Sequence, residues 1–255
     1  MRRVFLFIIC VALGLAMILS GYLIFKYYFE RLKAENAYNE ISEFAVSEDT
    51  GMPEPTLDLT SDDIAETTEA SEADIPISVD FEKLTAEYPD IVGWLYCAGT
   101  PINYPVMQGD DNIRYLRHLP NGSYNAAGSL FADYRCKNGV SGNYIICGHN
   151  MKSGSMFGTI TRYKSQDYYN EHPTLYFLTP EKTYRVELIA GFVTKSTGEA
   201  YDTQLTAEQV RQFCAESDFS SGITPQDDDV FITLSTCSYE YENARYVVIG
   251  RTIEI

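Results

Sequence analysis

The sequence predicts a mostly antiparallel β-barrel with a few peripheral helices, attached to a membrane by an N-terminal transmembrane helix. Many short β-prone runs, bounded by Gly, Pro, Asn or Asp, fill the chain beyond residue 76. Only two stretches of that part have helical periodicity. At the N-terminus, 22 consecutive residues from Val4 to Phe25 carry no charged side chain.

The apolar run predicts a retained membrane anchor. At about 1.5 Å per residue it can cross roughly 30 Å of hydrocarbon. It exceeds the h-region of about 7–15 residues in a cleaved signal peptide, and no small-x-small cleavage pattern follows it. Two arginines precede it and Lys26, Arg31 and Lys33 follow it, so basic residues alone do not decide the orientation. The acidic, enzyme-like remainder favours a short cytoplasmic N-terminus and an external C-terminal domain.

The segment from residue 34 to about 75 predicts a flexible acidic stalk, because it is rich in Glu, Asp, Thr, Ser and Ala and poor in large apolar residues. It carries much of the negative charge behind the formal −17, and nucleic acid is therefore not expected as a partner. The remaining length suits one domain with one core. The predicted organisation is a cytoplasmic N-terminus at 1–3, a transmembrane anchor at 4–25, a stalk at 26–75 and a catalytic domain at 76–255.

The elements of the domain follow in order. Residues 81–88 place apolar side chains on one helical face and precede a proline, which predicts a short opening helix. The runs 91–96 and 102–106, separated by a Gly-containing turn, predict a β-hairpin. Residues 206–216 predict an amphipathic helix capped by Thr206. Further strands are predicted at 129–131, 143–147, 174–178, 184–194, 230–236 and 246–254.

The six cysteines fit no metal-binding pattern, since the chain has no C-x-x-C and its histidines lie at no ligand spacing from them. No metal and no other cofactor is expected. Four cysteines of the external domain are even in number and could form disulfides, but a domain of this size needs none, and buried free thiols are slightly favoured. These four are Cys97, Cys136, Cys147 and Cys214.

A thiol stands at the end of the strand-like run 231–237. Alternation with a period of two places Cys237 at the strand end, on the same face as Ser235. A hairpin into the next apolar run would return Arg245 beside Cys237. A surface ion pair of Arg245 with Glu240 or Glu242 is the structural alternative. A second arginine, at position 251, is a more distant candidate for the same role.

An imidazole is also available beside the thiol and the guanidinium. His149 follows the predicted strand 143–147 in a Gly-His-Asn-Met turn, and loops commonly hold catalytic groups. His118 and His172 lie in polar segments and are expected at the surface. Thiol, imidazole and guanidinium are the groups that a cysteine acyl-transfer enzyme needs for the nucleophile, proton transfer and oxyanion stabilisation.

Several motifs resemble the sortase family, and within it class B. The resemblance covers roughly 170 residues and includes the helix at 206–216. It implies an eight-stranded sortase barrel with an N-terminal helix and a helix inserted between late strands. The motifs are DIVGWL at 90–95, TPINYPVMQ at 100–108, DNIRYL at 111–116, AGSLFAD at 127–133, YIICGHNM at 144–151, SMFG at 155–158, TLSTC at 233–237 and RYVVIGR at 245–251.

The resemblance implies a transpeptidase in the cell membrane of a Gram-positive cell, with its catalytic domain facing the wall. Cys237 would attack the threonine carbonyl of a C-terminal sorting signal similar to LPxTG or NPxTN in a secreted protein. His149 would transfer protons and Arg245 would stabilise the oxyanion. The acceptor would be an amine of a peptidoglycan precursor, lipid II. By the same resemblance, Asn112 and Ser235 are expected to contact the sorting peptide.

Three other functions stay open at this point. A pilin-polymerising sortase would use a lysine amine of another protein as the acceptor. A cysteine endopeptidase would use water in place of an amine. A catalytically silent binding barrel on a membrane tether would form no thiol-dependent adduct.

Overall fold

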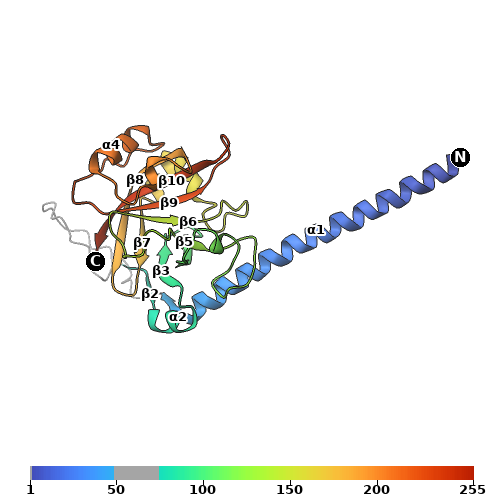
Figure 1. The fold of residues 1–255 in the computed structure, drawn as a ribbon, viewed down its shortest axis with the longest axis horizontal. Coiled ribbons are helices and arrows are strands. Elements are labelled where there is room, and N and C mark those ends of the chain that lie inside the picture. The colour runs from blue at the N-terminus through green and yellow to red at the C-terminus, as the bar shows by residue number, and fades with distance from the viewer. Residues whose placement is uncertain (1, 49–74) are drawn as a thin grey trace, which may run out of the picture.

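A computed structural model describes residues 2–48 and 75–255. A single long helix, α1, projects from one side of a β-barrel (Figure 1). The helices are α1 (Arg2–Ala45), α2 (Phe81–Glu87), α3 (Gln166–Glu171) and α4 (Ala207–Glu216), with short 3-10 helices η2 (Arg114–Leu116), η3 (Ile160–Lys164) and η4 (Glu199–Tyr201). The strands are β1 (Val46–Glu48), β2 (Ile77–Val79), β3 (Ile91–Tyr96), β4 (Asn103–Met107), β5 (Leu130–Ala132), β6 (Asn143–Cys147), β7 (Thr174–Leu178), β8 (Thr183–Lys195), β9 (Phe231–Cys237) and β10 (Ala244–Glu254).

Strands β3 to β10 close into the predicted eight-stranded barrel, in the order β10-β8-β7-β3-β4-β5-β6-β9. Most neighbours are antiparallel, and the β3–β4 and β9–β10 hairpins form as predicted. Two neighbouring pairs, β4–β5 and β6–β9, are parallel. The β6–β9 pair matters for function, because parallel neighbours have their C-terminal ends at the same edge of the sheet.

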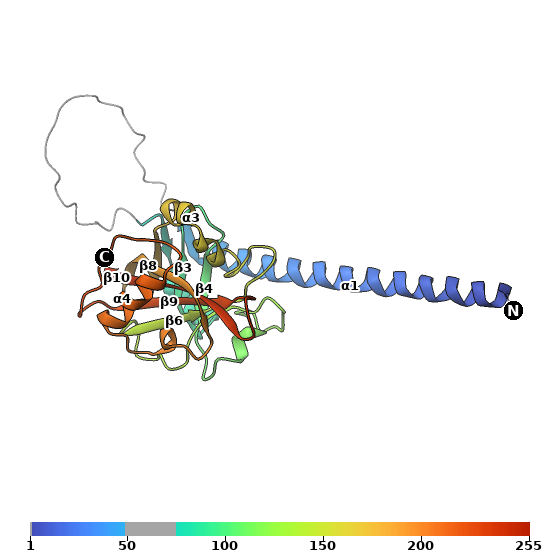
Figure 2. The same ribbon diagram turned by 90° about the horizontal axis from the view of Figure 1, so that it is seen from above.

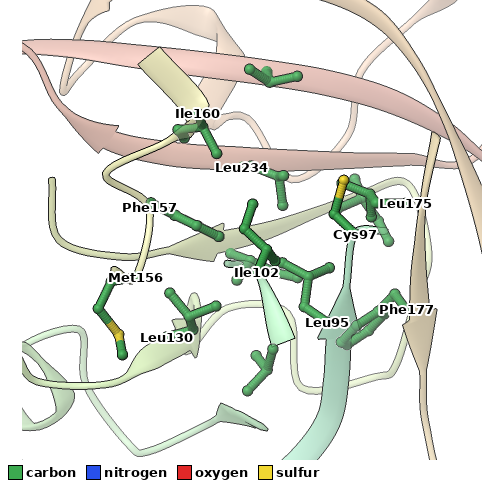
Figure 3. Close-up of a cluster of buried hydrophobic side chains, with 14 of the residues drawn as sticks. Leu95, Cys97, Ile102, Leu130, Met156, Phe157, Ile160, Leu175, Phe177 and Leu234 are labelled. Atoms are coloured by element: carbon green, nitrogen blue, oxygen red, sulfur yellow. The ribbon is translucent and has the colours of Figure 1, made fainter. Parts of the chain in front are cut away.

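Apolar side chains from all sides of the barrel fill its interior. Leu95, Ile102, Leu130, Phe177 and Leu234 are each fully buried. Figure 3 shows these side chains converging from β3, β5, β7, β9 and the loop before β4. Close packing of this kind fixes the relative positions of the strand ends, where functional side chains lie.

Helix α4 is the predicted helix between the late strands, β8 and β9. Thr206 caps it through a capping box with Gln209. Val210 and Phe213 are buried on its inner face, where they pack on the outside of β8, β9 and β10.

The prediction of a flexible stalk is wrong for residues 26–45, which continue α1 to its C-terminal end. Apolar side chains at helical spacing pack this part of α1 against the barrel domain, and Tyr38 and Ile41 are buried there. The Tyr38 hydroxyl donates to the Gly128 carbonyl at 2.6 Å. Strand β1 then pairs with β2, so the folded unit begins well before residue 76. The rest of the predicted stalk, 49–74, lies outside the described residues.

No residue is buried in the most hydrophobic window of the apolar N-terminal part of α1, whose mean hydropathy is 2.7. By length and composition, α1 is the one helix in the described part of the chain that could span a membrane. This helix includes the predicted anchor at 4–25.

Candidate active site

The predicted thiol and guanidinium meet across one hairpin. Cys237 is the last residue of β9, and Arg245 is the second residue of β10. The antiparallel register pairs them directly, which confirms the predicted return of Arg245 beside Cys237. Asn243 helps the turn because it adopts a left-handed conformation, with φ of 62°, that asparagine tolerates better than most residues.

Three hydrogen bonds hold the loop that carries His149 against the end of β9. The Gly148 amide donates to the Ser235 carbonyl at 3.0 Å. The Thr236 hydroxyl donates to the Gly148 carbonyl at 2.8 Å, and the Asn150 side-chain amide donates to the Cys237 carbonyl at 2.8 Å. This arrangement continues the parallel β6–β9 pairing beyond the strands and places His149 at the same end of the barrel as Cys237.

The residue before His149 must be a glycine. A Cβ atom on Gly148 would lie 2.3 Å from Leu130 and 2.8 Å from Phe157, both of which are buried core side chains. Contacts that short do not occur between packed carbon atoms. The glycine therefore allows the loop to approach the barrel closely before the chain turns out to present the imidazole.

The hydrogen bond of His149 assigns its tautomer. Its Nε2 atom lies 2.7 Å from the carbonyl oxygen of Leu116. A carbonyl oxygen only accepts, so Nε2 carries the proton and donates it. In the neutral imidazole, Nδ1 then has the free lone pair and is the atom able to exchange a proton.

Cys237, His149 and Arg245 line a single open cavity of about 450 Å³. The predicted substrate-contacting residues Asn112 and Ser235 line the same cavity. Cys237, His149 and Arg245 are each half-buried, so they combine a fixed position with access from outside. A second cavity, of about 370 Å³, lies between α1 and the barrel and holds none of these five residues.

The competing roles for the arginines are resolved by their partners. Among the described residues, Arg245 donates to the Ala244 carbonyl and has no carboxylate partner. Glu240 instead pairs with Lys164 and accepts from Ser238. Arg251 lies at the other end of the hairpin, opposite Phe231, where it binds Glu187 at 2.8 Å. Of these two candidates, Arg245 is therefore the arginine available to the cavity, and Arg135, which also lines the cavity, is bound to Asp133.

The polar groups of Asn112 already have partners within the protein. Its side-chain amide donates to Asp133 at 2.9 Å, and its side-chain oxygen accepts from the Tyr134 amide at 3.0 Å. Burial opposes ionisation of Asp133, but hydrogen bonds from Arg135 and Asn112 lower its pKa overall. Asp133 is thus a buried carboxylate that orients Asn112 at the cavity wall.

Sequence reasoning missed Tyr201, which lies in η4. Its hydroxyl is 2.5 Å from the hydroxyl of Ser235, which is almost completely buried. Burial raises the pKa of Tyr201, so it remains protonated and able to donate. Arg135 fixes this turn by donating to the Tyr201 carbonyl at 3.0 Å. No local pattern marks Tyr201 in the sequence, whereas Asn150 follows His149 directly and could have been suspected.

A second thiol lies in the same cavity. Cys147 is opposite Ser235 in the β6–β9 pair, and burial raises its pKa to about 12. A thiol with so high a pKa is protonated at neutral pH and is a poor nucleophile. The six cysteines, all within the described residues, are free thiols.

The other two histidines do not line the cavity. His118 bonds the Arg114 carbonyl at 2.8 Å near the surface, and His172 bonds the Ala98 carbonyl at 3.1 Å beside β7. Within residues 2–48 and 75–255, no cluster of three or more His, Cys, Asp or Glu side chains is placed to hold a metal ion.

Comparison with known proteins identifies the class. The family model of the sortase domain matches residues 96–253. Sortase B of Listeria monocytogenes is 35% identical over 182 residues, which cover 68% of this chain and 73% of that protein. The structure of a Staphylococcus aureus sortase B–substrate complex has a TM-score of 0.63 at 29% identity, covering 69% of this chain and 85% of that one. Sortase B from B. anthracis has a TM-score of 0.67 at 28% identity, covering 91% of this chain and all of that one.

The chain belongs to the sortase family of cysteine transpeptidases. Within that family it is a class B sortase, because its relatives and its structural neighbours are sortase B proteins and its barrel has the same eight-stranded form.

Proposed function

We propose that this sortase cleaves a C-terminal sorting signal similar to LPxTG or NPxTN and joins the released protein to an amine of a peptidoglycan precursor. The observation that carries the proposal is the direct pairing of Cys237 with Arg245, beside a loop that Asn150 ties to the Cys237 carbonyl. The structure of the S. aureus sortase B–substrate complex supports substrate binding in this class of protein.

The first half-reaction forms a thioester. The Cys237 thiol gives its proton to the free lone pair on Nδ1 of His149, and the thiolate sulfur bonds to the threonine carbonyl carbon. The oxygen of the tetrahedral intermediate becomes negative beside the Arg245 guanidinium. The peptide C–N bond then breaks. The departing amine takes a proton from Nδ1 of His149, while Nε2 remains hydrogen-bonded to Leu116.

The second half-reaction releases the product. An acceptor amine attacks the thioester carbonyl and gives its proton to Nδ1 of His149. The C–S bond breaks as the new amide bond forms, and the thiolate of Cys237 is regenerated. Arg245 stabilises the second oxyanion as it did the first, and Asn112 and Ser235 contact the bound signal peptide from the cavity wall.

The proposed setting is the outer face of the cell membrane, with the apolar part of α1 as a single-pass anchor. Its length, its hydropathy and the absence of buried residues in its most hydrophobic window support this assignment. Residues 1–3 would then be cytoplasmic, and the barrel would face the cell wall together with lipid II and the secreted protein substrates.

Product analysis tests the acceptor. Full-length protein is incubated with LPxTG, NPxTN and SPxTG peptides, with or without triglycine or a lysine-containing peptide, and the products are resolved by liquid chromatography and mass spectrometry. Ligation to triglycine supports the wall-anchoring reaction, and ligation to lysine alone indicates a pilin polymerase. Hydrolysis that added amine does not divert would identify an endopeptidase.

Two histidine variants are the matched controls for this assay. His149→Ala should abolish ligation and hydrolysis, because proton transfer to the leaving amine is lost. His118→Ala should leave both rates unchanged, since that imidazole bonds the Arg114 carbonyl outside the cavity. Equal activity of the two variants would exclude His149 from the reaction.

A further inference from the structure

Helix α1 sets the height of the barrel domain above its apolar segment. The helix is continuous from Arg2 to Ala45, and the uncharged run ends at Phe25. The side-chain amide of Asn125 donates to the Glu30 carbonyl at 2.8 Å. Glu30 lies five residues beyond Phe25 in the helix, which is about 7.5 Å along the axis.

That distance is the depth of a headgroup layer, since headgroups add roughly 5–7 Å on each side of the hydrocarbon. If the uncharged run spans the bilayer, the loop that contains Asn125 therefore lies at the outer edge of the lipid headgroups. Tyr38 and Ile41 pack the later turns of α1 on the domain, so the domain does not swing freely about this helix.

The face of the barrel toward the N-terminus of α1 is the face that carries the candidate active site. In both views, the turn between β9 and β10 lies on the side of the barrel toward which α1 projects, whereas α4 lies on the far side (Figures 1 and 2). Cys237 ends β9 and Arg245 lies at the start of β10, at the base of this turn.

Exposed tyrosines belong to two segments on this side, the loop that bonds to Glu30 and the turn between β9 and β10. Tyr124, next to Asn125, is 62% exposed. Tyr239 and Tyr241, in the β9–β10 turn, are 79% and 44% exposed. Tyrosine favours the boundary between lipid and water, because its ring is apolar and its hydroxyl is polar. Residues 26–35 of α1 hold three basic and two acidic side chains, which leaves a net charge of +1 next to the apolar run.

We propose that Tyr124, Tyr239 and Tyr241 rest on the bilayer surface, so that the active-site cavity opens at the lipid headgroups. This inference rests on the proposed membrane anchoring. It deepens the proposed function, because an acceptor linked to a lipid and a protein substrate still held in the membrane would both reach Cys237 without leaving the surface.

Tryptophan quenching in nanodiscs tests the proposal. Full-length protein is placed in discs of phosphatidylcholine and phosphatidylglycerol that contain a nitroxide headgroup lipid. Tyr124→Trp and Tyr239→Trp report on the tyrosine face, and Gln212→Trp on α4 is the matched exposed control. The native Trp94 is fully buried and supplies a constant background.

We expect at least twofold quenching at positions 124 and 239 and little at 212. Insertion of seven helix-forming residues after Phe25 would raise the domain by about 10 Å with little rotation, and should abolish that quenching. Equal, weak quenching at all three positions would overturn the proposal, as would quenching at 124 and 239 that survives the insertion.

A separate label distinguishes failure of the anchoring. Leu15→Trp lies in the middle of the uncharged run and should be quenched by a lipid with its nitroxide on the acyl chain. If Leu15→Trp is quenched and the tyrosine face is not, the anchor stands and the surface contact is wrong. If Leu15→Trp is not quenched, both the anchoring and the contact fail, while thioester formation on soluble peptides remains a separate result.

Discussion

Strand β10 carries one arginine near each end of the β9–β10 hairpin, Arg245 and Arg251, and the two have different partners. Arg251 binds Glu187 through two guanidinium nitrogens, at 2.9 Å and 2.8 Å. Arg245 faces Cys237 and, within the described part of the chain, has no carboxylate partner. One end of the hairpin is closed by an ion pair, and the other is left open as a cavity.

This difference between the two arginines shows how the Arg245 guanidinium is kept free to bind an oxyanion. A guanidinium already paired with a carboxylate has few donors left for an oxyanion. Near Arg245, the carboxylate of Glu240 is instead occupied by Lys164 and Ser238. The contacts of Glu240 with Lys164 and Ser238 therefore keep this carboxylate from pairing with Arg245.

The largest expected effect comes from the open end. Arg245→Ala should reduce the acylation rate constant 10²–10³-fold, roughly the loss expected when one oxyanion donor is removed. Its free energy of unfolding should change by no more than about 0.5 kcal/mol, because no ion pair is broken. Rapid-quench kinetics and urea unfolding measure the two quantities. A large loss of stability with an unchanged acylation rate would show that Arg245 has a structural role and no role in the chemistry.

A smaller effect is expected at the cavity wall. Tyr201→Phe should lower kcat/KM about tenfold, because it leaves the buried Ser235 hydroxyl without its partner. The double variant Tyr201→Phe, Ser235→Ala should be no worse than the stronger of the two single variants. Tyr184 lies opposite Glu254, at the end of β10 far from the cavity, and Tyr184→Phe is the control that should leave kcat/KM unchanged. Additive losses in the double variant would show that the two hydroxyls act independently.

At the closed end, the expected change is in stability alone. Arg251→Ala should lower the free energy of unfolding by about 1 kcal/mol, because one carboxylate oxygen of the partly buried Glu187 loses two contacts while the other keeps Arg185 at 3.3 Å. Acylation should be unchanged. Lys182→Ala breaks a more exposed pair with Glu254 and should cost only a few tenths of a kcal/mol. A tenfold slower acylation in Arg251→Ala would assign that arginine to the chemistry.

The smallest effect depends on pH. Hydrogen bonds from Lys164 and Ser238 lower the pKa of Glu240 to about 2. A lowered pKa stabilises the fold above the ordinary value near 4.5, and this contribution is lost as pH falls toward 2. Because the pair is exposed, wild type and Glu240→Gln should differ by a few tenths of a kcal/mol at pH 7. Thermal unfolding from pH 7 to pH 2 should show the difference disappear between pH 4.5 and 2, whereas a constant difference would contradict this.

Much of the barrel could be predicted from local pattern. Strands such as 143–147 and 174–178 have the predicted bounds, because each is a continuous apolar run ended by Gly, Pro or a polar residue. The hairpin that joins Cys237 to Arg245 is also local. The parallel pairings β4–β5 and β6–β9 depend on distant segments and have no signal in any single window.

The error at residues 34–45 has a physical reason. The average composition of that segment is polar, but its buried residues Ala34, Tyr38, Ile41 and Ala45 recur at helical spacing on one face. Composition averages over all faces of a helix and hides such a stripe, whereas periodicity would have found it. Tyr201 is different, because tertiary contact alone brings it to Ser235.

The most direct test of the account is the intact mass of the full-length protein after incubation with LPxTG, NPxTN and SPxTG peptides. Cys237→Ala is compared with Cys147→Ala, which removes the other thiol of the same cavity. We expect an acyl adduct of one peptide on the wild type and on Cys147→Ala, and none on Cys237→Ala. An adduct that persists in Cys237→Ala, or that disappears only in Cys147→Ala, would contradict it.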